Sequence, residues 1–206
     1  MPAIGITGGI STGKSTFVEC LREVLPEATF FDADAAVHKL FDRPEVQKDI
    51  QREFGTRVFS TVGDLNRAKL RAIVFTDAIK KRALERILHP RIRRQWRTEA
   101  KRHRNSPNFF FADIPLLYET GGETLCDRVV VVACSQNVQL DRLKKRMSIT
   151  AAEARKMIES QVSLKEKMRR ADHVVWNNGD RAVLIEQARF SVALWQGQTW
   201  TKKQRH

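Results

Sequence analysis

The chain has 206 residues, 42% hydrophobic and 30% charged, which is typical of one globular domain or of one core with an inserted subdomain. The sequence contains no apolar run long enough to span a bilayer, no secretory pattern at the N-terminus, and no CxxC spacing among three cysteines, so we expect a cytoplasmic protein with reduced thiols. The formal net charge of +13 favours polyanionic partners, which are nucleic acid, an anionic membrane surface or phosphorylated small molecules.

The expected elements alternate between strands and helices along most of the chain. A short apolar strand over 3–7 leads into a glycine-rich loop, and apolar residues at helical spacing predict a helix over 15–25. The remaining strands are expected over 29–31, 109–114, 128–134 and 173–176, and further helices over 136–146 and 181–195. This alternation indicates an α/β fold, a three-layer core with a five-stranded parallel sheet.

The stretch between the second and third strands is expected to be almost entirely helical, with breaks near Arg43-Pro44, Gly55, Gly63-Asp64 and His89-Pro90. It is too long for one crossover connection. We therefore predict an inserted helical subdomain over 35–104, between the two parts of a nucleotide-binding core, 1–34 and 105–206.

A second polar and basic helical segment covers residues 147–170. Thr150 and Glu153 have the spacing of a capping box, which predicts that a helix begins there. The segment is either a lid that closes over a nucleotide and excludes water, or an ordinary connection between the fourth and fifth strands.

The glycine-rich loop over residues 8–15 fits the pattern G-x-x-x-x-G-K-[ST] between a strand and a helix. Its glycines allow the backbone to turn tightly and to present several N–H groups to one phosphate cluster, beside the positive end of the following helix. In this mechanism Lys14 reaches the β- and γ-phosphates and the Ser15 hydroxyl coordinates Mg²⁺. The alternative is a chance glycine turn before an amphipathic helix. We predict that nucleotide phosphates contact Gly8, Gly9, Ile10, Ser11, Thr12, Gly13, Lys14, Ser15 and Thr16.

Three carboxylates follow the expected second and third strands, where ligands bind in parallel sheets. Asp32 is interpreted as a helix N-cap. Asp34 is either a general base for an acceptor hydroxyl or a first-turn carboxylate that stabilises the helix dipole. Asp113 either binds Mg²⁺, directly or through water, or is a turn residue before Pro115.

Arg142 and Arg146 lie four residues apart and therefore on one face of a helix. Two guanidinium groups on one face can bind a transferring phosphoryl group and offset its charge. The alternative is a solvated basic face, which spacing alone favours.

These motifs together resemble the dephospho-coenzyme A kinase family. The resemblance covers most of the chain, in the family's order and spacing. It rests on "GITGGISTGKST" (5–16), "DADAAVHKL" (32–40), "GDLNRAKLRAIVF" (63–75), "LHPRIR" (88–93), "DIPLLYE" (113–119), "QLDRLKKR" (139–146) and "ADHVVWNNG" (171–179). It implies a P-loop kinase core, a helical coenzyme A-binding subdomain and a helical lid. The implied reaction moves the γ-phosphate of ATP, with Mg²⁺, to the ribose 3′-hydroxyl of dephospho-coenzyme A, the last step of coenzyme A biosynthesis.

The resemblance also implies roles for single residues. Asp34 corresponds to the general base, and Arg142 to the arginine near the transferring phosphoryl group. The residues implied on the nucleotide side are Thr7, Lys14, Arg146 and Asn178, and those on the acceptor side are His89, Pro115, Leu116 and Glu119.

The loop departs from the family pattern Gly-Gly-Ile-Gly-Ser-Gly-Lys-Ser, because Ser11 replaces the middle glycine and Thr12 the serine. If position 11 requires a positive φ, Ser11 stores about 1–3 kcal/mol of strain.

The resemblance leaves two other functions as alternatives. One is another P-loop kinase, acting on a nucleoside, a nucleotide or a sugar acid. The other is a basic nucleic-acid-binding protein, which the sequence disfavours because it has no recognisable module and no aromatics interleaved with its basic clusters. We expect ATP and dephospho-coenzyme A as partners, no specific nucleic acid, no membrane, and a monomer or weak homo-oligomer.

Overall fold

A computed structural model of the chain describes residues 3–197. The chain forms two compact units. One contains the residues up to Phe31 together with those from Glu99 onward, and the other contains Asp32–Thr98. No helix within residues 3–197 has the length and apolar character needed to cross a membrane.

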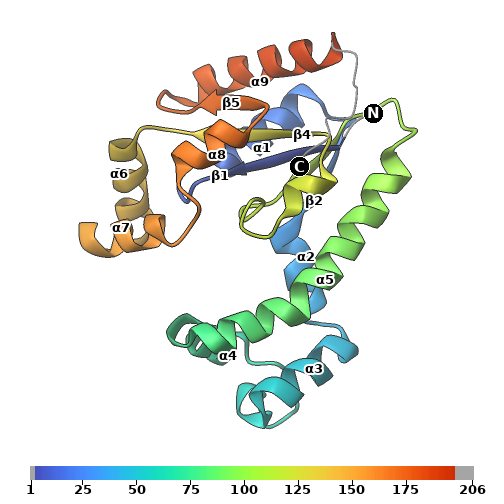
Figure 1. Cartoon of the computed structure of the whole chain (residues 1–206), viewed down its shortest axis with the longest axis vertical. Coiled ribbons are helices and arrows are strands. Elements are labelled where there is room, and N and C mark those ends of the chain that lie inside the picture. The colour runs from blue at the N-terminus through green and yellow to red at the C-terminus, as the bar shows by residue number, and fades with distance from the viewer. Residues whose placement is uncertain (1–2, 198–206) are drawn as a thin grey trace. The chain divides into compact units, whose positions relative to one another are not determined.

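A five-stranded sheet is the centre of the first unit, and its strands are in the order β2-β3-β1-β4-β5 (Figure 1). The strands are β1 (Ala3–Gly8), β2 (Thr29–Asp32), β3 (Phe110–Asp113), β4 (Arg128–Ala133) and β5 (His173–Trp176). β1 runs parallel to β3 and β4, and β4 runs parallel to β5. The predicted α/β fold with a parallel sheet is confirmed, and each strand lies within two residues of its expected position.

Helices cover this sheet because its central strands are apolar on both faces. The helices that lie wholly in this unit are α1 (Lys14–Val24), α6 (Gln136–Met147), α7 (Ala151–Glu159), α8 (Leu164–Arg170) and α9 (Arg181–Gln196), with a short 3₁₀ helix η2 (Gly122–Leu125). α1 and α9 pack against each other and against one face of the sheet, where Phe17, Leu21 and Trp195 are fully buried. On the other face α8 contacts β4, so the unit has three layers.

On the edge strand β5, a side chain from α9 forms hydrogen bonds with the backbone of one residue. The amide of Gln187 accepts a hydrogen bond from Trp176 N at 3.1 Å and donates one to Trp176 O at 2.9 Å. Both backbone hydrogen-bonding groups of Trp176 are therefore satisfied by one glutamine.

The second unit is helical and has a core of its own. It contains α2 (Ala33–Leu40), α3 (Pro44–Phe54), the 3₁₀ helix η1 (Thr56–Val58), α4 (Arg67–Thr76) and most of α5 (Ala78–His103). The expected breaks at Gly55 and Gly63 fall between helices, and the one at Arg43-Pro44 coincides with the start of α3. Val46, Ile50 and Leu70 are at most 2% exposed.

The expected helix break at His89-Pro90 is wrong, because α5 continues through Pro90. Proline cannot donate the usual hydrogen bond within a helix, so contacts outside the backbone must stabilise this turn. In the adjacent turn, the guanidinium of Arg91 donates to Ile87 O at 2.6 Å and to Asp49 Oδ2 at 2.5 Å, which binds this part of α5 to α3.

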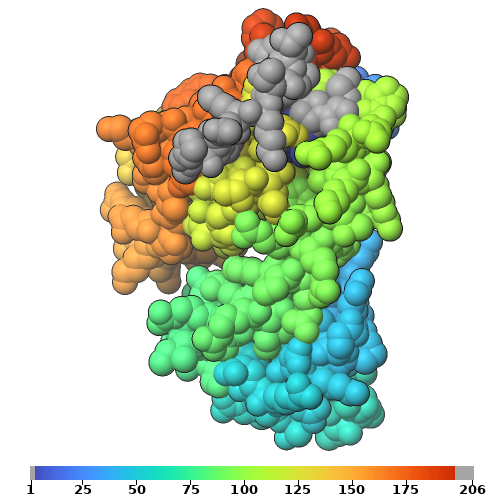
Figure 2. All heavy atoms as spheres, turned by 45° about the vertical axis from the view of Figure 1, so that its right-hand side comes forward, coloured from blue at the N-terminus to red at the C-terminus, as the bar shows by residue number. Residues whose placement is uncertain are grey.

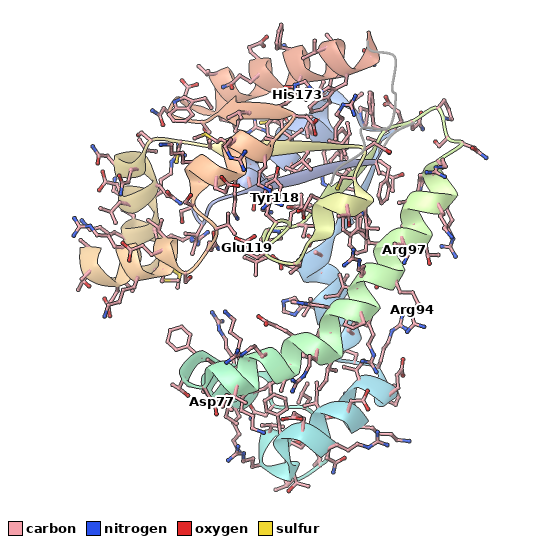
Figure 3. All side chains as sticks on the ribbon, viewed as in Figure 1. Asp77, Arg94, Arg97, Tyr118, Glu119 and His173 are labelled. Atoms are coloured by element: carbon pink, nitrogen blue, oxygen red, sulfur yellow. The ribbon has the colours of Figure 1, made fainter. Side chains whose placement is uncertain are left out.

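The excess positive charge of the chain is concentrated on α5. This helix carries ten Lys and Arg residues against two Glu, which accounts for +8 of the net +13. Its side chains lie at the molecular surface along much of its length, as the green spheres in Figure 2 show. Arg94 and Arg97, labelled in Figure 3, are exposed.

We expect the stability of the fold to decrease on acidification because of His173. Burial lowers the pKa of His173 below its usual range, while Asp172 raises that pKa and Arg128 lowers it. The unfolded chain therefore binds a proton more readily than the folded one, so stability falls as the pH drops below about 6.5. Between pH 7.5 and pH 5.5, the free energy of unfolding measured with urea should fall less in His173→Gln than in the parent protein. Equal losses would contradict the assignment.

Candidate active site

The phosphate loop joins β1 to α1, and close backbone approach explains two of its glycines. A Cβ at Gly8 would lie 2.6 Å from Val132 O, and one at Gly13 would lie 2.0 Å from Asn177 Nδ2. Gly13 also has a φ of 89°, which L-residues rarely adopt. Since Gly13 occupies the N-cap position without a side chain, no cap competes with an anion for the first N–H groups of α1.

Ser11 adopts the left-handed conformation, with a φ of 60°. Its hydroxyl oxygen is buried and has no hydrogen-bond partner among residues 3–197. The replacement of glycine at this position therefore stores backbone strain and adds an unsatisfied polar atom.

Alternate carbonyl groups of the loop are bound from outside it. Gly8 O accepts from Lys167 Nζ at 3.0 Å, and Ile10 O accepts from Gln139 Nε2 at 2.9 Å. Thr12 O accepts from Asn177 Nδ2 at 2.9 Å. The C=O and the following N–H of a trans peptide point in opposite directions. Because the carbonyl groups point toward Lys167, Gln139 and Asn177, the N–H groups of residues 9, 11 and 13 point away from these three side chains. Successive N–H groups on one side form an anion-binding concavity.

Lys14 and Asp113 form an ion pair at the carboxyl ends of β1 and β3. Both side chains are nearly buried, with exposed fractions of 14% and 13%. The two strands are neighbours in the sheet, where Ile6 lies opposite Asp113. A further bond joins the same strand ends, because Thr7 Oγ1 donates to Pro115 O at 2.9 Å. The structure thus brings together Thr7, Lys14 and Asp113.

Of the two arginines expected to share a helix face, only Arg142 contacts the loop. Its Nη1 donates to Asn177 O at 2.9 Å and more weakly to Thr12 O at 3.4 Å. Arg146, one turn further along α6, is exposed. Burial raises the pKa of the nearby Cys134 thiol, although Arg142 lowers it, so this cysteine is unsuited to act as a nucleophile.

Asn178 and Glu119 are bound by other parts of the same unit. The exposed Asn178 accepts a hydrogen bond from Ser135 N at 2.8 Å, and its neighbour Asn177 is the residue that faces the phosphate loop. Glu119 Oε1 accepts from Lys167 Nζ at 2.8 Å and from Val162 N at 3.0 Å.

Three predicted residues, Asp32, Asp34 and His89, belong to the helical unit, whereas Ser15, Thr16 and Leu116 belong to the first unit. Asp32 caps α2, accepting from Ala35 N at 2.9 Å, which confirms its interpretation as an N-cap. Asp34 lies in the first turn of α2 with an exposed side chain, and His89 is half-buried on α5.

Four residues that contact the loop were not identified from the sequence: Gln139, Gln161, Lys167 and Asn177. Gln139 precedes Arg142 by three positions and therefore shares its helix face, so the sequence could have predicted that both side chains face the loop. Lys167 lies among other basic residues of α8, and nothing in that run distinguishes it.

Within residues 3–197, no group of three or more His, Cys, Asp or Glu side chains is arranged to bind a metal ion. Mg²⁺ does not require such a group, because it usually takes one or two protein ligands together with water and substrate phosphates. The exposed Ser15 at the start of α1 and the carboxylate of Asp113 fit that limited donor set.

A parallel sheet whose first strand leads through this loop into a helix defines a P-loop nucleotide-binding protein. The model of the dephospho-CoA kinase family matches residues 2–182. A dephospho-CoA kinase from Symbiobacterium thermophilum is 42% identical over 181 residues, covering 87% of this chain and 75% of the relative. The chain belongs to the dephospho-CoA kinase family.

Solved structures agree with this assignment. A protein from Thermus thermophilus, TT1252, has a TM-score of 0.78 at 29% identity, covering 96% of this chain and 98% of that one. A dephospho-CoA kinase from Campylobacter jejuni has a TM-score of 0.67 at 25% identity, covering 94% and 96%.

We predict opposite effects on stability from substitutions at two left-handed positions of the loop. Ser11→Gly should raise the free energy of unfolding by about 1 kcal/mol, because relief of strain exceeds the entropy that glycine adds to the unfolded chain. Gly13→Ala should lower it by at least about 2 kcal/mol, because its Cβ meets Asn177. Urea unfolding measures both. A less stable Ser11→Gly protein would show that the position is not strained.

Proposed function

We propose that this protein transfers the γ-phosphate of ATP to the ribose 3′-hydroxyl of dephospho-coenzyme A, giving coenzyme A and ADP. The observation that carries the proposal is a phosphate loop with outward-bound carbonyls beside Lys14, in a chain of the dephospho-CoA kinase family. Family membership supplies the acceptor, and the loop supplies the site for the donor.

The nucleotide phosphates bind to the inward N–H groups of the loop and to the ammonium group of Lys14. Before nucleotide binds, Asp113 pairs with Lys14 and positions it at the end of β1. Mg²⁺, bound by the Ser15 hydroxyl and by Asp113 directly or through water, would neutralise charge on the β- and γ-phosphates.

Arg142 offsets the charge that develops on the transferring phosphoryl group. Its Nη1 is bonded to carbonyl groups of Asn177 and Thr12, which fixes the guanidinium against the loop. A guanidinium has five N–H donors, so others remain for the phosphate. Arg146 and Asn178 contribute to nucleotide binding in this proposal.

Asp34 accepts the proton of the acceptor hydroxyl as the general base. It is an exposed carboxylate two residues after β2, and ligands of parallel sheets bind beyond the carboxyl ends of the strands. The acceptor is bound by the helical subdomain with His89, and by the segment after β3 with Pro115, Leu116 and Glu119. Within the predicted lid over 147–170, residues 147–160 are the part that closes over the nucleotide and excludes water from the transfer. The rest of the segment is bound to the phosphate loop and to Glu119 through Gln161, Val162 and Lys167.

An acceptor panel tests the proposal against other P-loop kinases. ADP release is followed with dephospho-coenzyme A, and separately with nucleoside, nucleotide and sugar-acid acceptors. We expect stimulation by dephospho-coenzyme A alone, with a product heavier by one phosphoryl group in mass spectrometry. Stimulation by another acceptor and not by dephospho-coenzyme A would overturn the proposal.

Asp34→Asn should lower kcat by at least about 100-fold and leave nucleotide affinity within about twofold, because a general base acts mainly in the transition state. Steady-state kinetics and calorimetric titration with Mg·ADP measure the two effects. Asp32→Asn is the matched control, since asparagine caps a helix as well as aspartate does. Equal losses of kcat and nucleotide affinity in Asp34→Asn would instead indicate a role in metal or nucleotide binding.

Lys14→Ala should abolish measurable turnover, because the ammonium group binds the phosphates. It should leave the fold largely intact, because it removes one ion pair and no residue of the hydrophobic core. Acceptor-dependent ADP release measures the first effect, and circular dichroism measures the second. Turnover equal to that of the parent protein would remove the loop lysine from the mechanism.

A further inference from the structure

The phosphate loop and the segment after β3 meet at one buried charge, the ammonium group of Lys167 on α8. Its Nζ lies 3.0 Å from Gly8 O, 3.5 Å from Pro115 O and 2.8 Å from Glu119 Oε1, and its side chain is 0% exposed. We propose that Lys167 is a positioning residue, which sets the distance between the phosphate loop and the segment after β3, residues 114–119. This inference rests on the proposed kinase function.

A buried lysine is a costly way to stabilise a fold. Its charge loses the hydration of bulk water, and well-packed apolar residues often stabilise a protein as much as a buried ion pair does. An ammonium group has three N–H donors, and Lys167 has three acceptors in two different segments. An apolar side chain would fill the same space and leave the distance between those segments unspecified.

The acceptors of Lys167 are connected to the groups that bind the phosphates. Gly8 O belongs to the peptide whose N–H, that of Gly9, points toward the other side of the loop. Pro115 lies two residues after Asp113, the ion-pair partner of Lys14, and Pro115 O also accepts from Thr7. A shift of the Lys167 ammonium group would therefore displace both sides of the Lys14–Asp113 pair.

The chain just before Lys167 contacts the same two segments. Gln161 Oε1 accepts from Ile10 N of the loop at 3.1 Å, and Val162 N donates to Glu119 Oε1 at 3.0 Å. Glu119, labelled in Figure 3, lies in the segment after β3. Its Oε1 atom accepts from both Val162 N and Lys167 Nζ. Residues 161–167 thus connect the two sides, and Lys167 is the only one of the three contacting residues that carries a charge.

The test compares Lys167→Met with a matched variant on the same helix, Arg170→Gln. Arg170 pairs with Glu123 and lies over the Tyr118 ring at 4.3 Å, so it also binds α8 to the chain after β3. Neither Glu123 nor Tyr118 belongs to the phosphate loop. Initial rates with ATP and dephospho-coenzyme A, Mg·ADP titration and urea unfolding are measured for both variants.

Lys167→Met should lower kcat about 10- to 100-fold, since misplacement by about 1 Å can reduce rates that far. We expect its Mg·ADP affinity to fall about tenfold and its KM for dephospho-coenzyme A to stay within about threefold. Arg170→Gln should lose stability yet keep kcat and Mg·ADP affinity within about twofold. A purely structural role predicts lower stability in both variants and unchanged kinetics in the folded fraction of each.

A folded Lys167→Met protein with kcat and Mg·ADP affinity within twofold of the parent would overturn the inference, as would equal kinetic losses in Arg170→Gln. If Lys167→Met does not fold, Lys167→Gln, which keeps two N–H donors, decides by the same criteria. If the parent protein shows no turnover with dephospho-coenzyme A, the proposed function fails. The Mg·ADP affinities then decide the role of Lys167 separately.

Discussion

The direction of the peptide groups in the phosphate loop determines what the rest of the first unit must supply. A loop can present N–H groups to an anion only if its carbonyl groups have partners elsewhere, because a buried carbonyl without a partner is costly. Lys167, Gln139 and Asn177 provide those partners from α8, from α6 and from the residue after β5. The crossover helices and the sheet thus have a second role besides forming the core, since they fix the orientation of the loop.

Much of the architecture was predictable because local patterns determine it. Continuous apolar runs marked the strands, and the capping box at Thr150 and Glu153 is present. The helix through Pro90 was not predictable, because Arg91 stabilises it through Asp49, forty-two residues away. A proline is a local signal that disfavours a helix, whereas the contact that overrides it is tertiary.

The candidate site shows the same division. The loop, Lys14 and Asp113 were identified because motif spacing and strand ends bring them together. Gln161 and Lys167 were missed because their partners in the loop, Ile10 and Gly8, lie more than a hundred residues earlier in the chain. Their neighbours in the sequence are polar or basic as well, so composition does not distinguish a buried lysine from the exposed residues around it.

The bond pattern at Trp176 has a consequence for how this protein behaves at high concentration. The outer strand of a sheet with free N–H and C=O groups is a template on which a strand from another molecule can align and begin aggregation. The side-chain amide of Gln187 forms the same pair of hydrogen bonds with Trp176 that one residue of an incoming strand would form. An incoming strand therefore finds the N–H and C=O groups of Trp176 already bonded. At that point the sheet is closed to intermolecular extension by a side chain of its own chain.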